Sequence, residues 1–133
     1  MNEILVPIAP GELIDKLTIL QLKLEHITAP EKRANVAHEQ TVLQATAEAH
    51  LPDDPALRTL WKELYRINGD LWVIEDDIRK CEGAGDFGPA FIALARAVYV
   101  TNDERAAVKK RINLLLGSAI VEEKSYYAPS DTL

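Results

Sequence analysis

The segment LRTLWKELYRINGDLWVIEDDIRKCE, residues 57–82, carries the pattern from which the fold follows. Successive residues of an α-helix lie about 100° apart around its axis, and at that spacing the apolar residues of this segment fall into one sector. They are Leu57, Leu60, Trp61, Leu64, Ile67, Leu71, Trp72, Ile74 and Ile78. The pattern predicts a long amphipathic helix that buries one face against other helices.

Polar residues interrupt the apolar sectors of two expected helices. In residues 57–82 they are Asn68, Glu75, Arg79 and Glu82. In residues 104–120 they are Arg105, Lys109 and Asn113. A buried charge is costly unless it is paired and hydrogen-bonded. We therefore expect Glu75, Arg79 and Arg105 to be buried and the two sets to face each other, either as a salt-bridge network that fixes the helices or as the lining of a pocket.

Prolines, glycines and capping residues divide the chain into helices. Asp54 is a good N-cap for a helix that begins at Pro55. Thr101, followed three residues later by Glu104, forms a capping-box pattern that should open a last helix. The expected helices are about 11–28, 30–50, 55–82, 89–100 and 104–120. The sequence thus predicts an all-α, antiparallel helical bundle of about five helices.

The two ends of the chain are expected to differ from the bundle. Residues 1–10 should form an extended arm or edge strand, because the residues between 4 and 8 are mostly apolar and β-branched while Pro7 cannot donate to a central strand. Residues 125–133 should be a partly ordered tail. The first helix, about 11–28, is apolar on more than one side. Such a helix is either central to the bundle or covered by a second subunit.

Composition and charge narrow the class of protein. The chain has 133 residues, of which 47% are hydrophobic and 27% charged, with a net charge of −6. This length suits one domain, residues 1–133, and the acidic balance argues against nucleic-acid binding. No stretch approaches the ~20 apolar residues of a membrane span. Cys81 is the single cysteine, and the N-terminus does not resemble a signal peptide, so we expect a cytoplasmic protein.

The short motifs in the chain do not indicate a cofactor or a metal. Residues 83–88 satisfy the spacing G-x-G-x-x-G, but they follow an expected helix, whereas a dinucleotide site needs a preceding strand. Glycine as a C-cap of one helix and Asp86 as an N-cap of the next explain them better. The three histidines have no partners at metal-ligand spacing. We expect no metal and no cofactor, and whether the chain is an enzyme stays open.

Five segments resemble a family of small bacterial proteins catalogued only as a domain of unknown function. They are VPIAPGELIDKLTIL (6–20), LWVIEDDIR (71–79), GDFG (85–88), TNDER (101–105) and IVEEKSY (120–126). The resemblance spans nearly the whole chain and implies a bacterial cytoplasmic protein, but it implies no activity or catalytic residue. For the segment GELIDK (11–16), the resemblance also implies an association with sugar-transfer systems.

Two functions fit these observations. The leading hypothesis is a non-catalytic binding or assembly module that self-associates as a homodimer through the first helix and the arm. The alternative is a small enzyme or binding protein for an anionic metabolite, phosphorylated or carboxylated, with or without a linked sugar. In that case Arg79, Arg105 and Lys109 would bind the anion. Glu75 or Glu82 would act as a general base.

Overall fold

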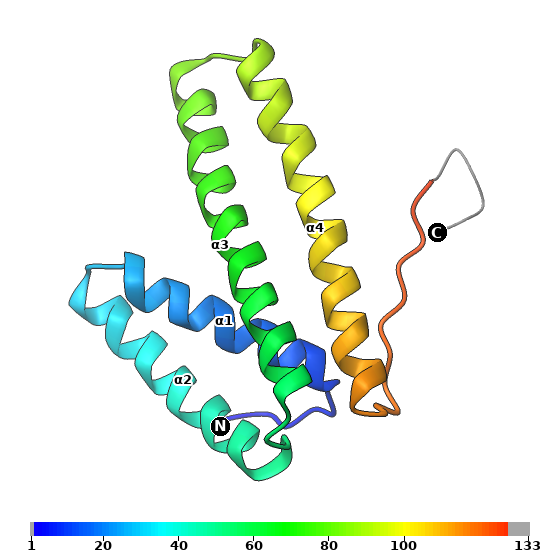
Figure 1. Ribbon diagram of the computed structural model, residues 1–133. Helices are drawn as coiled ribbons and strands as arrows, with labels where there is room; N and C mark the ends of the chain where they lie inside the picture. The colour runs from blue at the N-terminus through cyan, green and yellow to red at the C-terminus, as the bar shows by residue number, and fades with distance from the viewer. Residues whose placement is uncertain (1, 128–133) are drawn as a thin grey trace.

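Four helices make up the regular structure of the described chain (Figure 1). The structure is a computed structural model, and it describes residues 2–127. The helices are α1 (Pro10–His26), α2 (Pro30–His50), α3 (Pro55–Ala84) and α4 (Pro89–Leu115). The described residues contain no strand. The all-α class is therefore confirmed, and the helix count is lower than expected.

Local signals explain where the helices begin and end. Every helix begins at a proline, whose missing N–H is not needed in the first turn. Asp54 caps α3 by accepting a hydrogen bond from the Ala56 N–H at 2.8 Å. Gly85 ends α3 with a φ of 66°, in the left-handed region that favours glycine. The expectation that Asp86 is the N-cap of α4 is wrong, because Gly88 occupies the N-cap position. The Gly88 N–H donates a hydrogen bond to Asp86 Oδ1 at 3.1 Å.

The expected boundary between a fourth and a fifth helix is wrong. Residues Thr101 and Glu104 lie in the interior of α4, which runs unbroken to Leu115 and ends before Gly117. A capping box stabilises a helix end only where the preceding residues leave the helical conformation. No proline or glycine lies between 90 and 116 to force such a break. The local signal is therefore overridden by the continuous helix.

The N-terminal edge strand is not confirmed. Residues 2–9 form neither helix nor strand. A strand needs a neighbouring strand for its backbone hydrogen bonds, and the described residues offer none. The apolar side chains of Ile4, Leu5 and Val6 are 74%, 85% and 66% exposed. These residues thus form an arm that the rest of the described chain does not cover.

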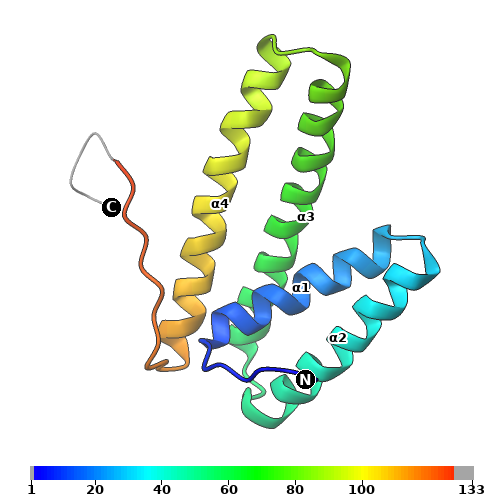
Figure 2. The ribbon, with the colours of Figure 1, turned by 180° about the vertical axis from the view of Figure 1, so that it is seen from behind.

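The expected C-terminal tail is described only in part, because residues 128–133 lie outside the described range. The segment that follows α4 runs back alongside that helix, and the views in Figures 1 and 2 agree on this course. Two ion pairs link it to α4. Lys110 Nζ lies 3.3 Å from Glu123, and Lys109 Nζ lies 3.5 Å from Glu122.

The helices form two antiparallel hairpins that cross, rather than one bundle with all axes aligned (Figures 1 and 2). Helix α1 lies between α2 and the α3–α4 hairpin. Its Leu13 and Leu17 pack with Ala47 of α2. Its Ile14, which is fully buried, belongs to the core formed with α3 and α4. Both apolar sides of α1 are thus covered within the chain, so α1 does not need a second subunit to cover it.

The α3–α4 hairpin extends well beyond α1 (Figure 2). None of residues 72–107, which form the outer part of the hairpin, is fully buried. Val73, Ile92 and Tyr99 are each more than half exposed. Within residues 2–127 no helix is long and apolar enough to cross a lipid bilayer.

Candidate functional site

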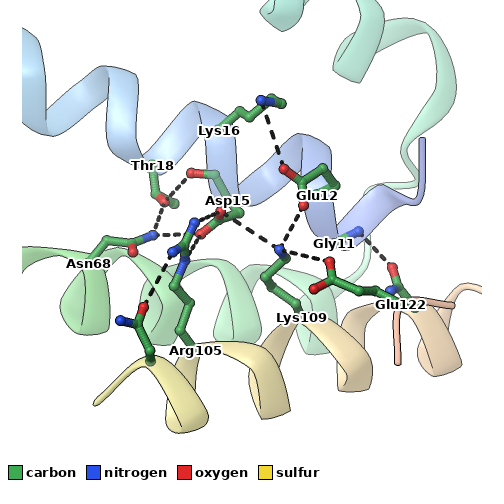
Figure 3. A network of polar contacts seen from close by, with 11 residues as sticks. Gly11, Glu12, Asp15, Lys16, Thr18, Asn68, Arg105, Lys109 and Glu122 are labelled. Carbon is green, nitrogen blue, oxygen red and sulfur yellow. Dashed lines mark hydrogen bonds and ion pairs between the residues drawn. The ribbon is translucent and has the colours of Figure 1, made fainter. Parts of the chain in front are cut away.

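A cluster of polar side chains lies where α1 crosses α3 and α4 (Figure 3). Its centre is Asp15 of α1, which is only 1% exposed. Arg105 of α4 donates a 2.8 Å hydrogen bond from Nε to Asp15 Oδ1, and its Nη2 donates to Asp15 Oδ2. Two parallel bonds between a guanidinium and a carboxylate give a strong and directional pair. This pair joins α1 to α4.

Two neutral side chains complete the surroundings of Asp15. Asn68 of α3 donates from Nδ2 to Asp15 Oδ1 at 2.9 Å and to Thr18 Oγ1 at 2.8 Å. The Thr18 hydroxyl donates to the backbone oxygen of Asp15 at 2.8 Å. No buried side-chain nitrogen or oxygen among the described residues lacks a hydrogen-bond partner. The cluster therefore joins three helices with every buried polar group satisfied.

Lys109 of α4 lies among carboxylates and is only 13% exposed. Its Nζ donates to Glu12 Oε2 at 2.6 Å. It also lies 3.5 Å from Glu122 Oε2 and 4.0 Å from Asp15 Oδ2. Lys109 thus forms ion pairs both with α1 and with the segment that follows α4 (Figure 3).

Helices α1 and α4 approach each other closely at Gly11. The Gly11 N–H donates to Asn113 Oδ1 at 2.8 Å, which satisfies one free donor at the start of α1. A Cβ at position 11 would lie 2.5 Å from the backbone oxygen of Lys109. Only glycine permits this approach. Gly11 therefore sets the distance at which Lys109 and Glu12 meet.

The environment of Asp15 changes the pKa of both partners in the pair. Burial would raise the pKa of Asp15, but hydrogen bonds from Arg105 and Asn68 and the charges of Arg105 and Lys109 together lower it below its ordinary value. The pKa of Arg105 is raised, mainly by its hydrogen bond to Asp15, against the effect of burial. Both groups are thus held in their charged forms.

Little free space remains inside this cluster. The cavity beside it has a volume of about 30 Å³. Its lining includes Glu12, Lys109 and Asn113. Such a volume holds about one or two water molecules, whereas pockets for small ligands measure about 300–1,000 Å³. The described residues contain no group of three or more His, Cys, Asp or Glu side chains that could hold a metal ion.

A family model matches residues 4–133, which is nearly the whole chain. The chain belongs to DUF6165, a family of unknown function. The resemblance to an uncharacterised family is thereby confirmed. Searches of curated proteins and of solved structures find no match. Membership in DUF6165 therefore adds no activity to the geometry described above.

The structure brings together four of the seven expected polar residues, and Asn68 is one of them. Arg105, Lys109 and Asn113 lie together in the cluster, but they meet α1 instead of Glu75, Arg79 and Glu82. The Glu75 and Arg79 side chains form a 3.2 Å ion pair and are 42% and 77% exposed. Glu82 is exposed and forms no ion pair within the described residues. The expectation that Glu75 and Arg79 are buried is wrong.

The level of each residue along the hairpin explains this difference. Asn68 and Arg105 are equally far in sequence from the turn 85–88, one before it and the other after it, so they stand at one level of the antiparallel pair. Glu75 is closer to the turn and stands level with Val98. Because a helix rises about 1.5 Å per residue, Glu75 stands about 10 Å beyond the level of Arg105.

The acidic residues of the site, Glu12 and Asp15, were missed in the sequence interpretation. The signal that identified Arg105 could also have identified Asp15. Asp15 and Thr18 are polar residues in a helix that is apolar on more than one side. A buried carboxylate in such a helix requires a positive partner from another helix.

We expect Asp15 to make the protein less stable in acid. Because its folded-state pKa lies below the ordinary value, the ionised carboxylate stabilises the fold at any pH above that ordinary value. This stabilisation is lost as the pH falls through the folded-state pKa. Urea unfolding from about pH 6 to pH 2 should therefore show a larger loss for the natural chain than for Asp15→Asn. Equal losses would contradict the role assigned to Asp15.

Proposed function

We propose that the protein, as a single helical domain, is a non-catalytic assembly module that self-associates as a homodimer. The observation that carries this proposal is the uncovered arm. Three consecutive apolar residues, Ile4, Leu5 and Val6, are at least 66% exposed in an extended segment. Extended segments with unpaired backbone groups pair readily with another chain. Two arms related by a two-fold axis would cover each other's side chains and backbone.

Two other apolar side chains favour contact at the same end of the molecule. Leu114 and Leu115, at the end of α4, are 64% and 42% exposed. Figure 1 places the end of α4 and the arm at one end of the molecule. These side chains could extend the apolar surface that two arms bury between them.

The closed polar cluster at the crossing of α1 also supports a non-catalytic role. Every charge in it is matched within the chain, and the adjoining cavity of about 30 Å³ is too small for a metabolite. Three lysines, Lys109, Lys110 and Lys124, line this cavity and are the feature that favours the alternative, an anionic ligand. Lys109 and Lys110 already pair with carboxylates, which weakens that alternative. We further propose that the module acts in the cytoplasm.

Self-association through the arm predicts a dimer that one substitution dissociates. Light scattering of the natural chain at micromolar concentration should give twice the 14.8 kDa mass of one chain. Leu5→Asp should give the mass of a single chain, because a charge would be buried between the arms. The substitution should leave the helical fold intact, since the Leu5 side chain is 85% exposed.

Val73→Asp on α3 is a matched control, because Val73 is also exposed, at 55%, and belongs to the outer part of the α3–α4 hairpin, which lies away from the arm (Figure 1). This variant should remain a dimer. A single-chain mass for the natural protein would contradict self-association. A dimer of Leu5→Asp would contradict the assignment of the interface to the arm.

A further inference from the structure

The face of the α3–α4 hairpin that α1 crosses continues beyond α1. Residues seven apart lie almost two turns apart and therefore on nearly the same side of a helix. On α4, Val98 and Phe91 precede Arg105 at this spacing. Arg105 binds Asp15 of α1, so its side of α4 is the one that α1 covers. Val98 and Phe91 thus extend this side toward the end of the hairpin.

The same spacing holds on α3. Glu75 and Glu82 follow Asn68, which also binds Asp15, and Ile78 follows Leu71. We call the surface formed by Ile78, Phe91 and Val98, with Glu75 and Glu82 beside them, the distal face. The apolar members of this face are half-buried, and the two carboxylates border them.

No other helix of the described chain lies over the distal face (Figures 1 and 2). Leu71 is the last fully buried residue of α3, and Val108 is the first fully buried residue of α4. The part of the hairpin between these two residues therefore carries no fully buried side chain. From Leu71 to the end of α3 at Ala84 the helix rises about 20 Å. A partner helix of about 13 residues would match this length. It would cover the apolar side chains as α1 covers those nearer the crossing.

Charge identifies the chemistry of that partner. Residues 72–104 carry seven acidic and three basic side chains, a net charge of −4, so most of the −6 of the whole chain is concentrated here. Glu75 and Glu82 place part of this charge beside the apolar residues. Arg79, which pairs with Glu75, is the basic residue next to them. A negative surface attracts a positively charged partner and repels a negatively charged one.

We infer that the distal face is a docking site for an amphipathic helix of another protein, with an apolar stripe and basic residues on the side of the stripe that lies along α3. The stripe would contact Ile78, Phe91 and Val98. The basic residues would pair with Glu82 and compete with Arg79 for Glu75. A second copy of this hairpin fits less well, because two acidic surfaces would face each other. The docking site is separate from the arm and does not require the homodimer.

The test uses the full chain and a fluorescently labelled probe peptide with leucines at helical a and d positions and lysines elsewhere. The peptide is long enough for about five helical turns, so that it spans the distal face. Fluorescence anisotropy at about 150 mM salt, where exposed charges are partly screened, measures its Kd. A second peptide carries glutamates in place of the lysines and should bind at least about tenfold more weakly. Equal binding of the two peptides would overturn the basic character assigned to the partner.

Paired variants locate the binding surface. Val98→Lys and Glu82→Lys should each weaken binding of the lysine peptide by about tenfold or more. Val100→Lys and Asp76→Lys make the same kinds of change on exposed positions outside the distal face, and should change the Kd by about twofold or less. Glu82 is exposed, so Glu82→Lys tests the site even if Val98→Lys fails to fold. Equal effects within either pair would overturn the location.

Light scattering of Leu5→Asp distinguishes a second copy from a different partner. If Leu5→Asp is a single chain and binds the lysine peptide, then the distal face binds its partner without dimerisation through the arm, as we infer. If Leu5→Asp is a dimer and the further substitution Glu82→Lys makes it a single chain, then the distal face is occupied by a second copy, and the inference is wrong.

Discussion

Replacing Arg105 with alanine should lower the free energy of unfolding by about 3–5 kcal/mol, whereas Arg79→Ala should change it by about 1 kcal/mol or less. The two arginines both pair with a carboxylate, but their surroundings differ. Asp15, the partner of Arg105, is 1% exposed, so without Arg105 its charge would be buried with weaker compensation. The pair of Arg79 and Glu75 is exposed to solvent, which screens it.

Urea unfolding at neutral pH, followed by circular dichroism, measures both free energies. The comparison is matched, because each variant loses one arginine from α3 or α4 and the helical propensity changes alike. Equal free energies would mean that the cluster around Asp15 does not hold the helices together. A larger loss for Arg79→Ala would restore the sequence-based expectation that the outer pair is buried.

Gly11→Ala should destabilise the protein by about 1–3 kcal/mol or more, while Gly83→Ala should stabilise it by up to about 1 kcal/mol. At position 11 the added methyl group would lie 2.5 Å from the Lys109 oxygen and 2.8 Å from Asn113 Oδ1. The first of these atoms belongs to the backbone, so α1 and α4 would have to move apart. The hydrogen bond from Gly11 to Asn113 would then weaken as well.

Position 83 is the matched control because it lies in α3, where the added methyl group would meet no atom within 4 Å apart from the adjacent residues and backbone of its own helix. There alanine only improves the helical propensity. Melting temperatures of the two variants should therefore shift in opposite directions from that of the natural chain. A shift of the same sign and size would show that α1 and α4 are not in close contact at Gly11.

Local structure could be predicted from the amino-acid sequence alone. Helix starts at Pro10, Pro30, Pro55 and Pro89 and the end of α3 at Gly85 follow from residues within a few positions of each boundary. The polar residues within apolar sectors also marked Arg105, Lys109 and Asn113 as members of a cluster. These features depend on helical periodicity and on capping, which act over at most a few turns.

The packing of the helices determines which faces these residues meet, and no local pattern reveals it. Asp15 and Arg105 are 90 positions apart in the chain, and Gly11 and Asn113 are 102 positions apart. The apolar sector of α3 is continuous, but α1 covers it only as far as Trp72, on whose ring His26 of α1 stacks with 4.8 Å between the centroids. Glu75 lies past that level and stays partly exposed. Periodicity specifies which side of a helix is apolar, whereas the crossing of another helix determines how much of that side is buried.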